Sequence, residues 1–156
     1  MKINAGVVEK NFNTLQRLYG AIIPDISALK DCLYSPLPLA GWMNPLKVST
    51  GQYARLLAED GITATPMSWC VEGMRFTTEK ALGRSWIYAV GMLQIQEEVS
   101  MLPSYILAPT ADDCVLDMCA APGNKTAQMS VMMQNRGTLI ANDINYNRLK
   151  ALGSSI

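Results

Sequence analysis

The residues that decide the fold run from 114 to 126 and read CVLDMCAAPGNKT. Their first five positions are mainly apolar and typical of a buried strand, and the small residues that follow indicate a tight loop. Residues 125–133 form a helix-favouring run, and residues 138–143, TLIAND, have the pattern of a second buried strand. Residues 114–143 therefore predict one strand–helix–strand unit of a parallel α/β sheet.

The spacing within this unit predicts a ligand site. Asp143 ends the second strand and lies 20 residues after Gly123. In doubly wound folds, an acid at about this separation accepts hydrogen bonds from ribose hydroxyls. Ala120, Ala121 and Gly123 let the backbone approach a ligand closely, and the start of the following helix offers unpaired N–H groups. The pattern is typical of a site for a nucleoside cofactor.

Two other nucleotide-binding loops can be compared with this one. The dinucleotide fingerprint G-x-G-x-x-G needs further glycines, whereas this loop has only Gly123. A P-loop needs Gly directly before Lys and another Gly upstream, but Asn124 separates Gly123 from Lys125 and Met118 occupies the upstream position. S-adenosylmethionine carries no phosphate and depends less on an anion-binding loop. The loop therefore favours S-adenosylmethionine over NAD or ATP.

For several residues a purely structural role is the alternative to a functional one. The carboxylate of Asp143 is also suited to cap the following helix, and this role is compatible with binding a ribose. Lys125 is either a solvated lysine or one that contacts the ligand. Three cysteines are predicted to be small buried hydrophobes rather than reactive thiols, namely Cys32, Cys70 and Cys114. Core packing is favoured over stacking on RNA bases for three tryptophans, Trp42, Trp69 and Trp86.

Composition narrows the class of protein. The chain of 156 residues carries 13 basic and 13 acidic side chains, and this zero net charge neither favours nor excludes a nucleic-acid partner. No apolar run approaches the roughly 20 residues of a membrane span, and the first residues lack a secretory signal pattern. We therefore expect a soluble cytoplasmic protein. The absence of histidine removes the mixed Cys/His zinc patterns and the commonest general base, so no metal is expected.

Residues 116–126, LDMCAAPGNKT, resemble the cofactor motif of the NOL/NOP/Sun family of RNA (cytosine-5) methyltransferases. The similarity extends to four further stretches, at residues 96–103, 141–149, 47–50 and 69–73. The last of them is similar to bacterial members that modify small-subunit ribosomal RNA. One departure is Asn124, where most relatives have a second glycine.

The resemblance implies an α/β, Rossmann-like S-adenosylmethionine-dependent methyltransferase fold, of which this chain holds the first part after a small α+β domain. It implies that S-adenosyl-L-methionine is wrapped by Cys119, Ala120, Ala121, Pro122, Gly123, Asn124 and Lys125. Asp143 is expected to hold the ribose, and Arg148 is a weaker candidate for the same site. The implied substrate is RNA, with ribosomal RNA favoured over transfer RNA.

The family's reaction needs residues that this stretch does not contain. A cysteine thiolate adds to C6 of cytosine, C5 then takes the methyl group, and elimination restores the ring. The resemblance places the two cysteines involved, in Pro-Cys and Thr-Cys motifs, on later strands beyond Ile156. We therefore expect no catalytic residue here and no activity from this stretch alone. The alternative is a non-catalytic module that binds S-adenosylmethionine or RNA and needs another segment.

The predicted organisation has two parts. Residues 1–90 are interpreted as a helical plus small α/β domain that positions RNA, and residues 91–156 as the start of the catalytic domain. Because two parallel strands with one complete helix leave an unpaired edge, the truncated chain is expected to self-associate or to dock on its own amino-terminal domain.

Local patterns predict the other elements. Apolar periodicity indicates a helix over residues 7–19, and Asp25 caps a second helix that ends at a proline-rich link. The elements expected next are a strand at 46–49, a helix at 52–59 and a strand at 62–65. Residues 91–107 are predicted to form a bent or two-part helix interrupted at Pro103.

Overall fold

The computed structural model describes residues 5–78 and 80–153. Its contacts divide the chain into two compact units, residues 1–37 and residues 38–156. Across the two described ranges, none of the helices has both the length and the apolar character that crossing a membrane requires.

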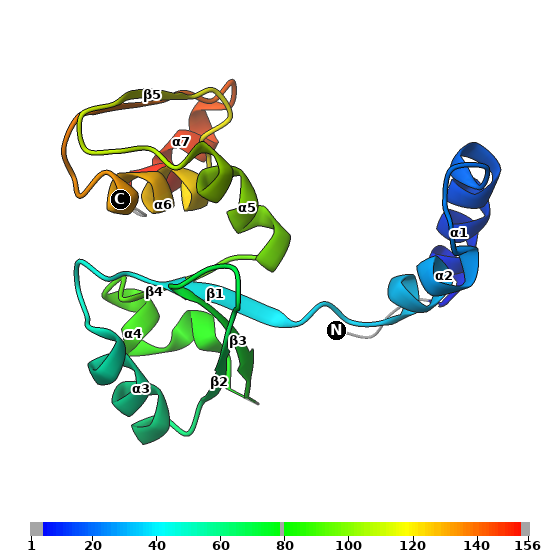
Figure 1. The fold of residues 1–156 in the computed structure, drawn as a ribbon, viewed down its shortest axis with the longest axis horizontal. Helices are drawn as coiled ribbons and strands as arrows, with labels where there is room; N and C mark the ends of the chain where they lie inside the picture. Colours follow the sequence, from blue (N-terminus) through cyan, green and yellow to red (C-terminus); the bar gives the residue numbers. More distant parts are fainter. Residues whose placement is uncertain (1–4, 79, 154–156) are drawn as a thin grey trace. The chain divides into compact units, whose positions relative to one another are not determined.

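The first unit is a pair of helices, α1 (Ala5–Tyr19) and α2 (Ile26–Tyr34) (Figure 1). The carboxylate of Asp25 begins α2 by accepting hydrogen bonds from two backbone N–H groups of its first turn, at 3.0 and 2.9 Å. Glu9 on α1 forms an ion pair with Lys30 on α2 at 3.3 Å. Both predicted helices are confirmed.

The second unit begins with a four-stranded antiparallel sheet (Figure 1). In spatial order its strands are β2 (Thr63–Pro66), β3 (Gly73–Thr77), β1 (Leu39–Met43) and β4 (Leu93–Ile95). Three helical segments belong to this part, namely α3 (Thr50–Glu59), the short 3-10 helix Leu82–Arg84 and α4 (Trp86–Ala89). The predicted helix at 52–59 and the strand at 62–65 are confirmed within two residues.

Neighbouring residues of β1 pack into two different hydrophobic clusters, one on each face of the sheet. Met43 packs with the helices α3 and α4, in a cluster that includes the fully buried Tyr53 and Ile87. Trp42, only 2% exposed, points to the opposite face and packs in a cluster with Met101 of α5 (Glu98–Leu107). This alternation follows from the two-residue period of a strand. One sheet therefore joins a helical layer to the second half of the unit.

That second half is a strand–helix–strand–helix run: β5 (Cys114–Asp117), α6 (Asn124–Met132), β6 (Thr138–Ala141) and α7 (Tyr146–Leu152). The strands β5 and β6 pair in parallel, with Val115 opposite Leu139. Val115 packs under α6 with Met129 and Met133. The predicted βαβ unit is confirmed, and it has the arrangement with which a Rossmann-like fold begins.

The predicted strand at residues 46–49 is wrong. Asn44 turns the chain there, because its side-chain oxygen accepts the N–H of Leu46 at 3.0 Å and its carbonyl accepts that of Val48 at 3.2 Å. Ser49 then caps α3. The strand lies earlier, at β1, in the stretch that was interpreted as the end of a proline-rich link.

The predicted bent helix over residues 91–107 is wrong in its first half. Leu93–Ile95 is a strand, and the helix α5 begins only at Glu98. Pro103 does not interrupt it. Pro103 is exposed, so the backbone hydrogen bond that it cannot donate is missing on the exposed side of α5. Since β4 completes the four-stranded sheet, the predicted domain boundary between residues 90 and 91 falls between α4 and a strand of that sheet.

The outcome for the cysteines and tryptophans is mixed. Cys70 is fully buried and Trp42 lies in the core, as predicted. Cys32 and Cys114 are exposed, so their predicted burial is wrong. Cys114 alternates with Val115 along β5 and therefore points away from the face that α6 covers. The core prediction also fails for Trp86, which is 49% exposed.

Candidate functional site

The site is built on the loop between β5 and α6, which three backbone hydrogen bonds hold to its surroundings. The N–H of Cys119 donates to Asp117 Oδ1 at 3.2 Å, and the N–H of Ala120 donates to the carbonyl of Asn142 at 2.9 Å. The N–H of Ala121 donates to Asp143 Oδ2 at 3.1 Å. Residues at the carboxyl ends of β5 and β6 therefore accept three successive N–H groups of the loop.

Asp117 also fixes the helix that follows the loop. Its Oδ2 accepts a hydrogen bond from the hydroxyl of Thr126 at 2.6 Å, and Thr126 is only 1% exposed. The carboxylate of Asp117 thus ties Cys119 of the loop to the first turn of α6. The loop cannot shift relative to the helix without breaking a charge-assisted hydrogen bond.

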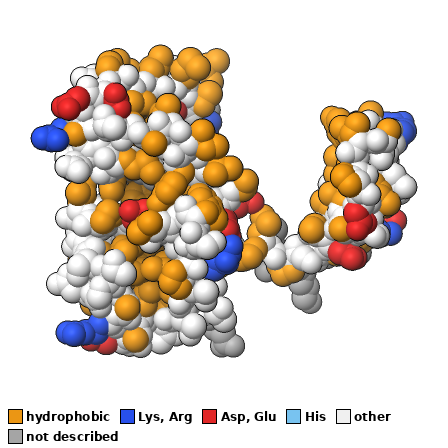
Figure 2. All heavy atoms as spheres, viewed as in Figure 1, with side chains coloured by type: hydrophobic (Ala, Val, Ile, Leu, Met, Phe, Trp, Pro, Cys, Tyr) orange, Lys and Arg blue, Asp and Glu red, His pale blue; other side chains and the backbone are white. Residues whose placement is uncertain are grey.

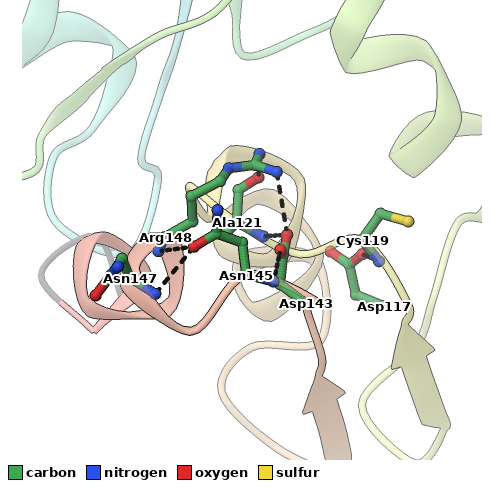
Figure 3. A network of polar contacts seen from close by, with 7 residues as sticks. All are labelled: Asp117, Cys119, Ala121, Asp143, Asn145, Asn147 and Arg148. Carbon is green, nitrogen blue, oxygen red and sulfur yellow. Dashed lines mark hydrogen bonds and ion pairs between the residues drawn. The ribbon is translucent and has the colours of Figure 1, made fainter.

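Asp143 lies two residues beyond the end of β6 and is 8% exposed. One oxygen accepts the N–H of Ala121, and the other accepts the N–H of Asn145 at 2.9 Å (Figure 3). The helix-capping alternative for Asp143 is wrong, because Asn145 Oδ1 accepts the N–H groups of Asn147 and Arg148 at the start of α7, at 3.0 and 3.3 Å, while Asp143 fixes the turn before them. Each carboxylate oxygen has two lone pairs, so these bonds leave acceptor capacity for a ligand hydroxyl.

Arg148, on α7, reaches back over Asp143 to the loop (Figure 3). Its Nη1 lies 3.5 Å from Asp143 Oδ2, and its Nη2 donates to the carbonyl oxygen of Ala121. The side chain of Arg148 is 53% exposed, whereas that of Asp143 is 3% exposed. A half-exposed guanidinium therefore compensates a buried carboxylate at the base of the loop.

Gly123 makes the sharp entry into α6. Its φ of 113° belongs to the left-handed region that favours glycine. Its carbonyl accepts the N–H of Ala127 at 2.7 Å, which is the first bond of the helix. Asn124 is already helical, so the departure from a second glycine places no side chain in a left-handed turn. The first N–H groups of α6 point out of the helix end, beside the loop.

A cavity of about 310 Å³ opens on the loop. This volume is within the range of small-molecule sites, which starts near 300 Å³. Six of the predicted residues line it, Cys119, Ala120, Ala121, Pro122, Asn124 and Lys125. Gly123 and Asp143 do not line it: Gly123 shapes the loop, and Asp143 holds it from behind.

The opposite wall of the cavity comes from the end of β4 and the start of α5, with Ile95, Gln96, Glu97 and Ser100. Gln96 is 4% exposed and doubly fixed, because it accepts from Trp42 Nε1 at 3.1 Å and donates to the carbonyl of Ser100 at 2.7 Å. Our site prediction did not include this wall. The signal for this wall lies in residues 96–103, which carry part of the family resemblance.

The start of α5 is anchored to the sheet through Glu98. Arg75 on β3 contacts both carboxylate oxygens of Glu98, at 2.7 and 2.6 Å, and Trp69 Nε1 donates to one of them at 3.1 Å. The hydrogen bond from Arg75, followed by that from Trp69, lowers the pKa of Glu98. This anchor fixes the segment that carries the second wall of the cavity.

Within the described ranges, no three His, Cys, Asp or Glu side chains are grouped so that they could hold a metal ion. The cavity wall that faces the loop offers the hydroxyl of Ser100 and the carboxylate of Glu97, whereas the amide of Gln96 is already bonded within the wall. The arrangement suits a small organic ligand that approaches the backbone closely and carries few charges.

Comparison with known proteins agrees with this geometry. Residues 104–156 match the model of the family described as 16S rRNA methyltransferase RsmB/F. Ribosomal RNA small subunit methyltransferase F of Shewanella oneidensis is 39% identical over 125 residues, which is 78% of this chain and 26% of the relative. The chain belongs to the RsmB/F methyltransferases of the Sun family.

A second curated relative and a solved structure are also similar to this chain. The enzyme of the same name from Vibrio cholerae serotype O1 is 35% identical over 143 residues, covering 86% of this chain and 30% of the relative. A solved methyltransferase homolog protein from Pyrococcus horikoshii superposes with a TM-score of 0.81 at 26% identity, covering 98% of this chain and 54% of that one. The chain thus spans between a quarter and a third of the length of these curated relatives. The family resemblance and the Rossmann-like α/β fold are confirmed.

Proposed function

We propose that this chain forms the S-adenosyl-L-methionine-binding front portion of an RNA (cytosine-5) methyltransferase that acts on small-subunit ribosomal RNA. The observation that carries the proposal is the cavity beside the loop of Cys119 to Lys125. That loop is held from two strand ends by Asp117 and Asp143. Family membership supports the reaction class, and the names of the curated relatives support the substrate.

The residues present fit S-adenosylmethionine. The small side chains of Ala120 and Ala121 allow an adenosine to lie against the loop backbone, and the start of α6 supplies N–H donors without a glycine-rich phosphate nest. Asp143 lies behind the loop and outside the cavity wall, and we propose that its remaining lone pairs accept a ribose hydroxyl in addition to the two backbone donors. Glu97, exposed at the cavity, supplies a negative charge suited to an amino-acid ammonium group.

The bound cofactor supplies an electrophilic methyl group, and the described residues orient it. Cys119 lies in the cofactor loop, with its backbone N–H held by Asp117. Its place in the wall makes it a binding residue, and we assign the thiol that attacks cytosine to a segment outside residues 1–156. In the proposed reaction that thiolate adds to C6, C5 takes the methyl group, and loss of the C5 proton with release of the thiolate restores the ring.

Lys and Arg side chains on the face shown in Figure 2 are scattered rather than gathered, in keeping with a net charge of zero. We propose that residues 1–90 position the RNA through shape and local contacts. A large electrostatic attraction is not required of this part.

Methyl transfer by the natural full-length protein tests the proposal. The protein is incubated with tritium-labelled S-adenosylmethionine and small-subunit ribosomal RNA, and the labelled nucleoside is identified after digestion. Label in 5-methylcytidine is the expected result. Binding of S-adenosylhomocysteine without labelling of any RNA would instead support the non-catalytic module, and absence of binding would remove the cofactor site.

A further inference from the structure

The two polar groups that flank Ala121 are held by one pair of oppositely charged side chains. Its N–H donates to Asp143 Oδ2 at 3.1 Å, and its carbonyl oxygen accepts from Arg148 Nη2 (Figure 3). The pair itself is joined, with Arg148 Nη1 at 3.5 Å from the same carboxylate oxygen. Ala121 lies in the wall of the cavity.

We propose that Arg148 is a positioning residue for the cofactor site: it holds the carbonyl of Ala121 and aims the carboxylate of Asp143 without touching the ligand. This inference rests on the proposed function. It differs from the role of a direct cofactor contact, which the sequence suggested only weakly for Arg148.

Two hydrogen bonds and one ion pair around Arg148 form a closed ring. Asp143 Oδ1 accepts the N–H of Asn145 at 2.9 Å, and Asn145 Oδ1 accepts the N–H of Arg148 at 3.3 Å. The guanidinium of Arg148 then returns to Asp143 Oδ2. The carboxylate is therefore fixed at both oxygens, one by the backbone of the turn and the other by the side chain that the turn positions.

This geometry needs an arginine. The guanidinium is a planar fork, and two of its nitrogens reach two different acceptors, the Asp143 carboxylate and the Ala121 carbonyl. A lysine at this position has one nitrogen and satisfies only one acceptor at full strength. A lysine variant keeps the charge and is expected to keep part of the function.

Removing the side chain of Arg148 should free both the carbonyl of Ala121 and the carboxylate of Asp143, which is the proposed acceptor of a ribose hydroxyl. The nucleoside part of the cofactor then binds less well, whatever is attached to its 5′ carbon. Methylthioadenosine, which lacks the amino-acid carboxylate, should therefore lose affinity by the same factor as S-adenosylhomocysteine. If Arg148 instead paired directly with the carboxylate of the ligand, only S-adenosylhomocysteine would lose affinity.

The experiment is calorimetric titration of the natural full-length protein with both ligands. Arg148→Ala is expected to weaken each about tenfold, the scale of one lost charge-assisted contact. Arg148→Lys should weaken each about threefold, in keeping with partial rescue. Lys150→Gln is the matched control, because Lys150 is an exposed cation of the same helix whose Nζ lies over the Tyr146 ring at 5.7 Å, and it should leave both affinities within about twofold.

The outcomes separate the two proposals. Unchanged affinities in Arg148→Ala, or a loss confined to S-adenosylhomocysteine, would overturn the positioning role while leaving the cofactor site in place. A protein that binds neither ligand before mutation would overturn the proposed function itself. If Arg148→Ala does not fold, the lysine variant decides: equal weakening of both ligands at an unchanged melting temperature supports positioning, and unchanged affinities contradict it.

Discussion

The turn before β6 offers a sharp test of how closely the βαβ unit is packed, through Gly137→Ala. Gly137 has a φ of 76°, and a Cβ added there would lie 2.6 Å from the carbonyl oxygen of Asp113 and 2.8 Å from that of Ala111. A left-handed backbone costs alanine about 1–2 kcal/mol. Displacing two backbone carbonyls adds about 1–3 kcal/mol, the range of overpacking.

Gly61→Ala is the matched control. Gly61 has a φ of 66°, but a Cβ added there would meet no atom within 4 Å. Gly61→Ala should therefore lower the free energy of unfolding by the left-handed backbone contribution alone, about 1–2 kcal/mol. The difference between the two variants isolates the steric contribution at Gly137.

The assay is urea unfolding of both variants under the same conditions, together with titration of S-adenosylhomocysteine. Gly137→Ala should lose about 1–3 kcal/mol more free energy of unfolding than Gly61→Ala. It should also weaken ligand binding, because β6 leads directly to Asp143. Equal losses of stability would refute the close approach of the turn to the segment before β5.

Three other predictions follow from named contacts. Asp143→Asn should weaken S-adenosylhomocysteine binding by about 1–3 kcal/mol in calorimetry, since it removes a charged acceptor. Asp112→Asn, at an exposed position before β5, should leave binding unchanged, and equal effects would contradict the role of Asp143. In the folded protein a thiol reagent should modify Cys32, Cys114 and Cys119 well before Cys70, because Cys70 is fully buried and burial raises the pKa of its thiol; rapid labelling of Cys70, mapped by mass spectrometry, would contradict this. Glu98→Gln should cost about 1 kcal/mol at neutral pH. Because the bonds from Arg75 and Trp69 lower the pKa of Glu98, that contribution is present above its ordinary value of 4.5 and is lost as the pH falls through the lowered value, so a difference from wild type that persists at lower pH would count against it.

The elements that local pattern predicted are those whose stability is mainly local. The helix of the first unit that Asp25 caps and the βαβ unit both carry their signals within a few residues. The strand β1 does not, because it holds Gly41 at its centre. A Cβ there would lie 2.4 Å from the carbonyl oxygen of Gln94, so the glycine is required by the approach of β4 from more than 50 residues away. Strand propensity cannot report such a contact.

The candidate site was predictable on one side only. The loop from Cys119 to Lys125 follows from its residues, since small side chains, a turn and a helix start are adjacent in sequence. The spacing of Asp143 from the loop was also readable, and it lies where a carboxylate can contact the loop backbone. The bond from Arg148 to Ala121 was not, because it depends on the direction in which α7 leaves the turn at Asn145.

The other wall of the cavity shows why the sheet matters to the proposed cofactor site. Gln96 is held on one side by Trp42 of β1 and on the other by Ser100 of α5. Trp42 is buried in a cluster that also contains Ala127 of α6, a residue of the helix behind the loop. The two walls are therefore packed against one side chain, and the width of the cavity depends on the antiparallel sheet as much as on the βαβ unit. A motif search confined to residues 114–143 describes only half of such a site, because the residue that sets the spacing between its halves belongs to the strand that the local pattern failed to predict.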